Sequence, residues 1–536
     1  MTGVYDIALV GSGVSSAYTL RHFLALLAEN PPTQPVRIIV FEKSGEFWSG
    51  VPYGRLSGRA SLLISPLQEF IPQEKERADF KTWLTANRHG LLDPAAATAG
   101  PLSARWQREN AAAISAGDWD HLYLPRHLFG SFLREKVTAA LAAAAAQGLI
   151  EFQLITSGIT DIERIGDLHR LIPDAGETAA VLAKKVVLAV GSPPSAGIAR
   201  ASEPGEASFI DDMYEPSLDA NIQRICQSLE QSSRRQVLIL GSNASALETL
   251  YNLANSAAAM RLIEKIIMLS PDAAFPHRIH REVPASTHRL AHLDALADLA
   301  SPVSQDILTA VEKDVAAAAA QGLNIADFYC AISHRMIATL GRLERREQEK
   351  FVAIHGVEIG KLQRRAGPEY LDTAHRLIAE GKLEMHRGRF AQYLPDTAGG
   401  PGFQYLEGRT GGPKVVTAPI SVIVSCAGFQ DVAKTSSTLL QNLIRRGLCS
   451  PNASQRGLAI NADYEASPGC HVMGPLVAGN IIGTVKIWHA ESCARIIQLA
   501  QHLAEILTRR PAAGGAKMRR RLTRPQHPPA RPGRTR

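Results

Sequence analysis

The sequence has only six cysteines in 536 residues, and none of them belongs to a Cys-x-x-Cys pair. Zinc ribbons and thioredoxin-type redox sites use two thiols at that spacing, so the pattern argues against both classes. Isolated cysteines are typical of buried thiols in a reducing compartment, and we therefore expect a cytoplasmic protein. A histidine pair beside arginines, His277 and His280, fits a solvated basic loop better than a metal site, and we expect no metal.

Long apolar runs are also missing. The apolar stretch at residues 5–10 stops at Gly11, far short of the roughly 20 residues that a membrane helix needs. The N-terminus has no basic segment before an apolar one, so no signal peptide is expected. We therefore expect no membrane partner.

The body of the chain lacks an excess of positive charge, although the net charge is +7. Residues 509–536 contain ten Lys/Arg and no acid, which leaves 48 basic residues against 51 acidic ones, about −3, in the rest. A Pro/Arg-rich tail cannot bury apolar surface, and we expect residues 508–536 to be disordered. The charge therefore gives no reason to expect a nucleic-acid partner.

Two stretches of the sequence share the order strand, glycine turn, helix, strand. The first has a strand at 4–10, a helix to Leu27 and a strand at 36–42, and the second has a strand at 236–240, a helix to about Ala257 and a strand at 265–269. Each stretch reads as a β-α-β unit. The predicted fold class is therefore α/β, with two Rossmann-like dinucleotide-binding domains.

The order of these elements predicts that one domain interrupts the other. We place one dinucleotide-binding domain at residues 1–215 and 415–507, and a second dinucleotide-binding and helical domain at 216–414. Further expected elements are a long helix at 125–147, a strand at 185–190, a loop at 395–413, a strand at 419–425 and a final helix at 486–509.

The first motif is Gly11-x-Gly13-x-x-Ser16, followed by Glu42 at the end of the next strand. Gly11 permits a tight turn, and Gly13 lets the backbone approach a pyrophosphate at the helix N-terminus. Ser16 is small enough for helix–strand packing, and Glu42 can accept hydrogen bonds from ribose hydroxyls. A glycine turn in an unrelated α/β protein is the alternative reading.

The second motif is Gly241-Ser-Asn243-Ala-Ser245. Asn243 stands where the second glycine is usual; its tolerance of left-handed backbone keeps the turn feasible, but its side chain would crowd a pyrophosphate. The strand at 265–269 is followed by Ser270 and Pro271, without the acid that favours NAD or the arginine that favours NADP. The choice between NADH and NADPH stays open.

These motifs, with further segments in the same order, resemble a bacterial FAD/NAD(P)-binding protein family, which is itself similar to the flavin N-hydroxylating monooxygenases of siderophore biosynthesis. The resemblance covers nearly all of residues 4–507. The segments that carry it include Ser49–Gly54, Leu124–Leu133, Gly241–Glu248, Cys426–Phe429 and Gly474–Gly479.

The resemblance implies which residues bind the cofactors, FAD and NAD(P)H. Gly11, Gly13 and Glu42 would hold the FAD diphosphate and ribose, and Gly241 and Ser245 would approach the nicotinamide dinucleotide. The remaining expected cofactor-binding residues are Ser16, Pro52, Tyr53, Arg126, Asn243, Gly428, Gly474 and Gly479. Arg126 could instead bind an acidic substrate or begin its helix. Trp488, His489 and Glu491 on the last helix could reach the flavin, and packing of the Trp is an equal alternative.

The expected function is an FAD-dependent NAD(P)H oxidoreductase, with a monooxygenase acting on a small amine-type substrate as the leading reading. The spacing of the residues identifies no catalytic side chain. None is needed, because the flavin itself carries the redox chemistry. Two alternatives remain: a regulatory or scaffold protein that binds FAD and NAD(P) without turnover, and a reductase or dehydrogenase that uses an acceptor other than oxygen. The oligomeric state is not predicted.

Overall fold

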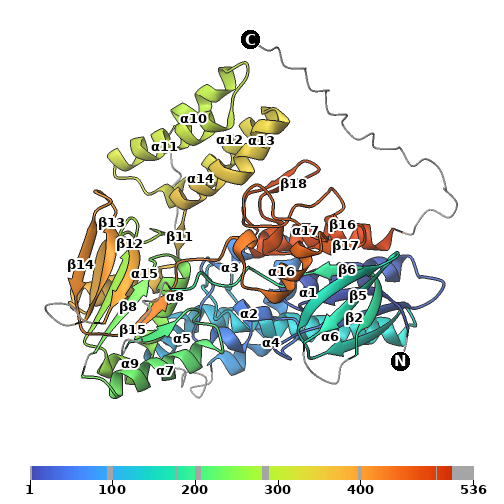
Figure 1. Cartoon of the computed structure of the whole chain (residues 1–536), viewed down its shortest axis with the longest axis horizontal. Helices are drawn as coiled ribbons and strands as arrows, with labels where there is room; N and C mark the ends of the chain where they lie inside the picture. The colour runs from blue at the N-terminus through green and yellow to red at the C-terminus, as the bar shows by residue number, and fades with distance from the viewer. Residues whose placement is uncertain are drawn as a thin grey trace, which may run out of the picture.

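The computed structural model describes residues 3–92, 100–174, 179–198, 207–233, 235–280, 289–395, 401–490 and 492–509. The chain has an α/β fold with two sheets of mainly parallel strands that lie side by side, the first at the right and the second at the left of Figure 1. A group of helices, α10 to α14, stands above them. The expected disordered tail lies almost wholly outside the described residues.

The first sheet contains the first predicted β-α-β unit at its centre. Its strands run in the order β16-β17-β6-β1-β2-β3, with β17, β6, β1, β2 and β3 parallel, while β4 and β5 extend β6 in antiparallel fashion. Their bounds are β1 Tyr5–Val10, β2 Val36–Phe41, β3 Ile150–Ile155, β4 Ile159–Ile165, β5 Leu168–Pro173, β6 Val181–Leu188, β16 Glu465–Ser467 and β17 Cys470–Val472. β1 and β2 are buried on both faces, which explains their nearly continuous apolar sequences.

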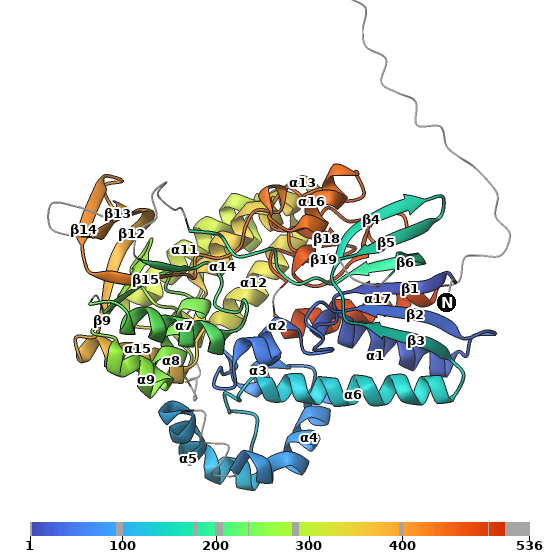
Figure 2. The same cartoon turned by 60° about the horizontal axis from the view of Figure 1, so that its bottom comes forward.

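Helices from both ends of the sequence cover one face of the first sheet. α1 (Val14–Glu29) packs between α17 (Cys493–Thr508) and α6 (His127–Ala146), as Figure 2 shows. Shorter or more peripheral helices on this side are α2 Gly50–Tyr53, α3 Leu67–Phe70, α4 Glu74–Leu92 and α5 Pro101–Ala116. The helix α16 (Thr438–Arg445) packs on β4. The C-terminal segment therefore completes the layer that the N-terminal segment begins.

The second sheet runs in the order β14-β13-β12-β9-β8-β15-β7. β12, β9, β8, β15 and β7 are parallel, and β13 and β14 form an antiparallel edge. The bounds are β7 Ser208–Ile210, β8 Gln236–Leu240, β9 Lys265–Ser270, β12 Leu383–Leu394, β13 Gly402–Glu407, β14 Pro413–Thr417 and β15 Ile420–Ser425. All its strands come from the part of the chain between β6 and β16.

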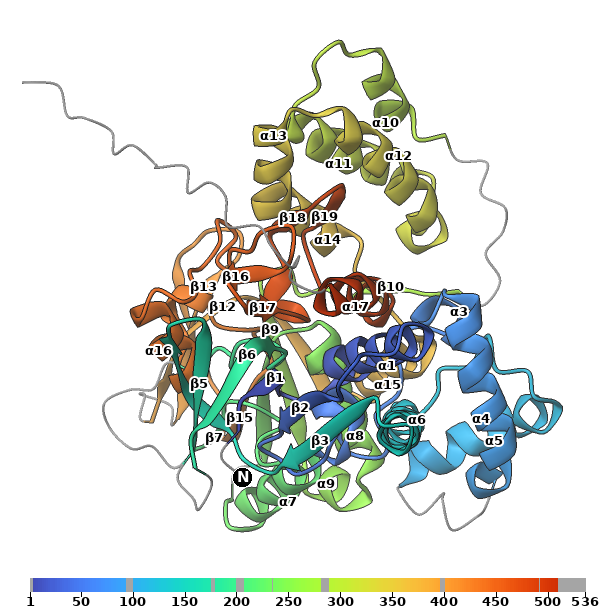
Figure 3. The ribbon, with the colours of Figure 1, turned by 90° about the vertical axis from the view of Figure 1, so that its right-hand side faces the viewer.

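Two sets of helices accompany the second sheet. α7 Leu218–Glu230, α8 Ala244–Asn255, α9 Ala257–Leu262 and α15 Pro368–Ala379 pack close to it. The upper group comprises α10 Ala291–Ala295, α11 Ser304–Ala320, α12 Tyr329–Arg342, α13 Arg345–Lys350, a π-helix at Phe351–His355 and α14 Gly356–Leu362. This group has its own apolar core, which Ile481 and Trp488 join from the C-terminal segment. Figure 3 shows the group above α17 and the hairpin of β18 (Asn480–Ile482) and β19 (Val485–Ile487).

The chain crosses between the sheets twice, and the two crossings pair with each other. Ala196 donates its backbone N–H to the Gly428 carbonyl (2.8 Å), and Gln430 donates to the Pro194 carbonyl (2.9 Å). Ser195 and Phe429 form an antiparallel bridge. The connection between the sheets is therefore a short two-stranded segment rather than two separate loops.

Several boundaries differ from those predicted from the sequence. β7 precedes residue 215 and β15 follows residue 415, yet both strands lie in the second sheet, so the expected domain limits at 215 and 415 do not coincide with the change of sheet. A buried apolar strand such as β15 fits either sheet, and only pairing assigns it. The loop expected at 395–413 contains β13, because the Gly and Pro residues that flank this short strand, such as Pro401 and Gly408, indicate a loop.

The last helix begins at Cys493 rather than near residue 486, since the Ser492 hydroxyl caps it and residues 485–487 form β19. Trp488 and His489 therefore precede the helix, and Glu491 lies outside the described residues. In the described part of the chain, no helix combines the length and the apolar character needed to cross a bilayer.

Candidate dinucleotide sites

The turn after β1 is shaped by contact with the neighbouring strand. Gly11 has a φ of +90°, and a Cβ there would lie 2.5 Å from the Ala189 carbonyl oxygen just beyond β6. Only glycine avoids both the strain and the clash. Ser16 is fully buried and donates its hydroxyl to the Gly11 carbonyl at 2.6 Å, so it ties the helix to the turn as well as packing closely. No side chain caps the N-terminus of α1, whose N–H groups are thus available to an anion.

Glu42 lies directly after β2 and is 9% exposed. One carboxylate oxygen accepts hydrogen bonds from the backbone and hydroxyl of Ser12, at 3.0 and 2.8 Å, and the other from the backbone and hydroxyl of Ser44, at 3.1 and 2.8 Å. The acid is therefore held beside the glycine turn, where a ribose would lie. Its two serine hydroxyls can rotate to admit ribose hydroxyls as alternative donors.

The segment around α2 passes directly over the first turn. Gly50 has a φ of +63°, and a Cβ on it would lie 3.1 Å from the Gly13 Cα. The Trp48 backbone N–H binds the Ser12 carbonyl at 2.9 Å. The expected flavin-side residues Pro52 and Tyr53 are thereby placed beside this turn.

Tyr53 is fixed on its other side by an aromatic cluster. Its ring packs edge-on against Phe129 at 5.1 Å between centroids and lies 5.8 Å from Phe70. A Cβ on Gly130 of α6 would lie 2.0 Å from the Tyr53 carbonyl oxygen, so α2 can approach α6 only at a glycine. Burial raises the pKa of the Tyr53 hydroxyl well above its usual range, and the phenol stays neutral.

Gly474 brings the C-terminal segment to the same turn. It follows β17 with a φ of +87°, and a Cβ there would lie 2.6 Å from the Ser15 hydroxyl in the first turn of α1. Gly479, also with positive φ, packs instead against Ser454, since a Cβ built on it would lie 2.2 Å from the Ser454 hydroxyl oxygen. The structure thus joins Gly474 to the first glycine turn and places Gly479 against another loop.

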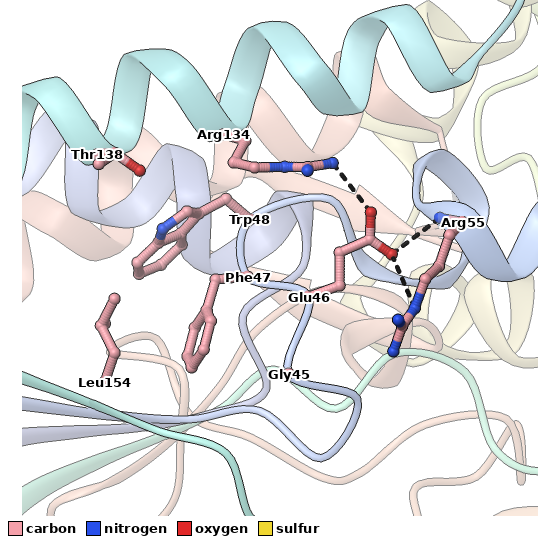
Figure 4. Close-up of a pocket in the computed structure, with 8 residues that line it drawn as sticks. All are labelled: Gly45, Glu46, Phe47, Trp48, Arg55, Arg134, Thr138 and Leu154. Carbon is pink, nitrogen blue, oxygen red and sulfur yellow. Dashed lines mark hydrogen bonds and ion pairs between the residues drawn. The ribbon is translucent and has the colours of Figure 1, made fainter.

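A cavity of about 430 Å³ opens a few residues beyond Glu42 (Figure 4). Phe47, Trp48 and Leu154 form its apolar side. On its polar side, Glu46 accepts a hydrogen bond from Arg134 at 2.9 Å and one from the Arg55 backbone at 2.8 Å. Its remaining lining residues are Gly45, Arg55 and Thr138.

The turn after β8 repeats the architecture of the first. Gly241 has a φ of +119°, and a Cβ there would lie 2.5 Å from the Cys426 carbonyl oxygen beyond β15. Asn243 starts α8 with extended backbone (φ −96°), so the left-handed tolerance expected of this Asn is not needed. Its side chain makes no capping hydrogen bond. The Ser245 carbonyl accepts a hydrogen bond from Thr249 at 2.8 Å, within the same helix.

Arg126 and Glu248 form a buried ion pair between α6 and α8. Two guanidinium nitrogens donate to the two carboxylate oxygens at 2.6 and 2.5 Å, and the Ser61 hydroxyl adds a third bond at 3.0 Å. Burial alone would lower the pKa of Arg126, but the Glu248 charge together with Tyr214 and Tyr370 outweighs it, and the net shift is upward. Arg126 thus has a protein partner in this structure, and the pair links α8, which follows the second glycine turn, to α6, which packs on α1 of the first.

Other sequence candidates have structural roles. Gly428 lies in the paired crossings between the sheets. His280 binds Asp327 at 2.8 Å, and Arg278 pairs with Asp372. Trp488 is 8% exposed and packs edge-on against Phe351, 5.5 Å between centroids. Among the described residues, no group of three or more His, Cys, Asp or Glu is arranged to hold a metal ion.

Sequence reasoning missed the residues that only tertiary contacts reveal. Ser12 and Ser44 hold Glu42, Gly50 shields Gly13, and Glu248 neutralises Arg126. Single serine and glycine residues produce no hydrophobic periodicity, so residue spacing alone could not identify them. Glu248 was part of the second motif, but its partner lies 122 residues away.

Residues 8–193 match a family model described as FAD-NAD(P)-binding, a range that contains the first glycine turn and Glu42. The uncharacterized proteins Rv3403c of Mycobacterium tuberculosis and Mb3437c of Mycobacterium bovis are each 34% identical to this chain over 509 residues, covering 94% of this chain and 95% of theirs. The chain belongs to their family. Its function must therefore be inferred from the site and the fold.

Solved structures with the same fold include three amine hydroxylases. The ornithine N-hydroxylase KtzI of Kutzneria sp. 744 has a TM-score of 0.54 at 13% identity, and the ornithine hydroxylase PvdA of Pseudomonas aeruginosa has 0.53 at 13%; each alignment covers 94% of this chain and 99% of the other. The cadaverine monooxygenase DfoA of Erwinia amylovora has 0.52 at 12%, covering 95% of both chains. At these identities the likeness establishes the fold.

Proposed function

We propose that this protein is an FAD-dependent NAD(P)H oxidoreductase, and more specifically a monooxygenase that hydroxylates a small amine. One observation carries the proposal: two glycine turns of the same construction lie in one chain, each at the N-terminus of a helix with no side-chain cap. Two such turns provide two anion-binding ends for two dinucleotides. The flavin-binding family model over residues 8–193 supports FAD in the first.

The residues of the first turn fit FAD. The backbone between Gly11 and Ser16 would hold the diphosphate, and Glu42 the ribose. The cavity beyond Glu42 offers an apolar side for the adenine, formed by Phe47, Trp48 and Leu154. Gly474 would border the isoalloxazine end, because it meets the first turn of α1 from the opposite segment of the chain.

When bound, FAD would supply the hydride acceptance and the oxygen chemistry of the reaction. The protein's own residues would hold and orient the two dinucleotides. Gly241, Asn243 and Ser245 would bind the reductant at the second turn. The Arg126–Glu248 pair would help to hold the two binding turns in position, since its buried, bidentate contact joins α8 of the second turn to α6, which packs on α1 of the first.

The amine substrate is proposed because the structural neighbours named above act on ornithine and cadaverine. The test uses purified full-length protein. Its flavin content is measured first, then anaerobic bleaching of the flavin by NADH and by NADPH, and finally oxygen-dependent NAD(P)H consumption with ornithine, lysine or cadaverine. The expected product carries one added oxygen atom, which mass spectrometry detects.

Each stage of the experiment tests a different part of the proposed function. Protein that carries flavin but is bleached by neither nicotinamide would overturn the oxidoreductase and fit a regulatory binding protein. Bleaching without an oxygenated product for any amine would overturn the monooxygenase and fit a reductase that uses another acceptor. Gly13→Val should lose flavin, since a larger side chain would fill the space between Gly13 and Gly50.

A further inference from the structure

The adenosine ribose of a dinucleotide at the second turn would lie at the C-terminal end of β9, where a side chain selects between NAD and NADP. The sequence there is Ser270, Pro271, Asp272, with no arginine. Ser270 is 3% exposed, and its hydroxyl accepts a hydrogen bond from the Ala273 backbone at 3.1 Å, so it offers a phosphate no positive charge. The strand itself therefore carries no selective group for a phosphate.

The neighbouring strand supplies an arginine at this position. β12 runs parallel to β9, with Arg387 directly beside Ser270. A Cβ built on Gly408 would lie 3.0 Å from Cγ and 3.2 Å from Nε of Arg387, and 2.8 Å from the Pro271 carbonyl oxygen. The Arg387 side chain and the segment after β9 thus meet at the same glycine.

Two further arginines reach this edge from separate segments. Arg409 directly follows Gly408. Arg364 precedes β11 (Arg365–Ala366); desolvation by the surrounding protein lowers the pKa of its guanidinium, and the nearby Asp272 carboxylate opposes that shift. Throughout the described ranges, none of the three guanidinium groups makes a hydrogen bond or ion pair, and all three side chains are exposed.

The acids near this edge do not neutralise the cluster. Glu407, next to Gly408, accepts from Lys414 at 2.8 Å and from Thr410 at 2.5 Å. Asp272 faces Arg364 without forming an ion pair with it. Three cations gathered from β12, the β13–β14 turn and the segment before β11 have the charge and the donors to bind a phosphate dianion.

We propose that the protein selects NADP(H) over NAD(H) by binding the 2′-phosphate with Arg387, flanked by Arg364 and Arg409. The inference rests on the proposed function, because it assumes that the second turn binds the reductant. It goes further because it names the reductant. It also assigns the choice between NADP(H) and NAD(H) to a residue of β12, whereas the selective residue usually lies at the end of the strand that corresponds to β9. A planar guanidinium can bind two phosphate oxygens at once, whereas NAD(H) presents a hydroxyl at that position.

Calorimetry on the FAD-loaded full-length protein tests this with adenosine 2′,5′-bisphosphate and AMP, which differ only in the 2′-phosphate. Wild type should bind the bisphosphate about tenfold or more tightly than AMP. Arg387→Ala should remove most of that preference and leave AMP binding unchanged. Arg387→Lys should keep part of the preference, because a lysine carries the positive charge but cannot donate two parallel hydrogen bonds to the phosphate.

Arg346→Ala is the matched control, since Arg346 is an exposed arginine on α13, in the upper helical group. It should leave the preference intact, which separates the local contact from the loss of one positive charge. An unchanged preference in Arg387→Ala would overturn the proposal, as would equal affinity of wild type for the two probes. In both cases NAD(P)H binding at the second turn could still stand. If FAD-loaded wild type bound neither these probes nor NADP⁺ nor NAD⁺, the second turn would not be a reductant site at all.

Discussion

The first and second glycine turns share one backbone plan. In the first, Gly11 donates its N–H to the carbonyl of Phe41, the last residue of the adjacent β2, and in the second, Gly241 donates to the carbonyl of Leu269 in β9, at 2.9 and 2.8 Å. A Cβ on either glycine would lie 2.5 Å from a carbonyl oxygen of the strand on the other side. The strand–turn–helix geometry is therefore fixed by the same two neighbours in both places.

The turns differ in what passes over them. Gly13 faces Gly50, with 3.5 Å between the position of a Gly13 Cβ and the Gly50 Cα, whereas Asn243 occupies the corresponding position in the second turn with similar extended backbone. The first turn also has Glu42 at the tip of its second strand, and the second has Ser270. Gly50 thus limits the size of a side chain at the second motif position of the first turn, whereas the second turn accommodates the side chain of Asn243.

Breaking the buried ion pair between α6 and α8 should have the largest effect. Arg126→Met would leave Glu248 charged and unpaired in the interior, which costs about 3–5 kcal/mol of stability. The midpoint of urea unfolding, followed by tryptophan fluorescence, should fall accordingly. The double variant Arg126→Met/Glu248→Leu removes both charges and should recover much of the loss; a double variant as unstable as the single one would contradict this account.

The shared plan predicts that Gly11→Ala and Gly241→Ala each cost about 2–4 kcal/mol, because each adds backbone strain and a clash with a carbonyl oxygen. Gly11→Ala should also empty the flavin site, while Gly241→Ala should keep flavin and weaken nicotinamide binding. Gly166 is the control: its φ is +61° but no atom lies within 4 Å of a built Cβ, so Gly166→Ala should cost only about 1 kcal/mol. Equal costs at all three glycines would show that the neighbouring strands do not shape the turns.

The different surroundings of the two turns predict different effects on cofactor binding when the residue at the second position of each motif is changed. Gly13→Ala should retain flavin, because 3.5 Å to Gly50 is ordinary van der Waals contact. Asn243→Gly should lower the dissociation constant for NADP⁺ severalfold, since it removes a side chain from the place where backbone meets diphosphate. Fluorescence titration of both variants against wild type measures this. Weaker NADP⁺ binding by Asn243→Gly would instead show that the Asn side chain contributes to the site.

The smallest expected effect is acid sensitivity at the start of α6, beside Arg126. Burial, reinforced by Arg59, lowers the pKa of His127 to about 4. Below its unfolded value of about 6.5 the unfolded chain binds more protons there, so stability is lost as the pH falls from about 6.5 through 4. His127→Gln should reduce that loss by about 1 kcal/mol between pH 7 and 4. His121→Gln, an exposed change on the same connection, should leave the pH profile as in wild type.

Much of the fold could be predicted locally. β1, β2, β8 and β9 follow from apolar runs, and each of the two glycine turns was placed by its residues. The assignment of β15 to the second sheet could not be predicted, because a strand buried on both faces has the same sequence pattern in any parallel sheet. The strand β13 was missed for a different reason, since it is short and lies among Gly and Pro residues that indicate a loop.

The sequence by itself determined where a dinucleotide phosphate could approach the backbone, because the glycines and small residues that a tight turn needs are adjacent in the chain. Only the tertiary structure decided which charged side chains serve those turns. Arg126 pairs with Glu248 across 122 residues, and Arg387 reaches the end of β9 through strand pairing. A backbone turn is a local property of a few φ angles, whereas a charge acts on whatever the fold places within a few ångströms of it.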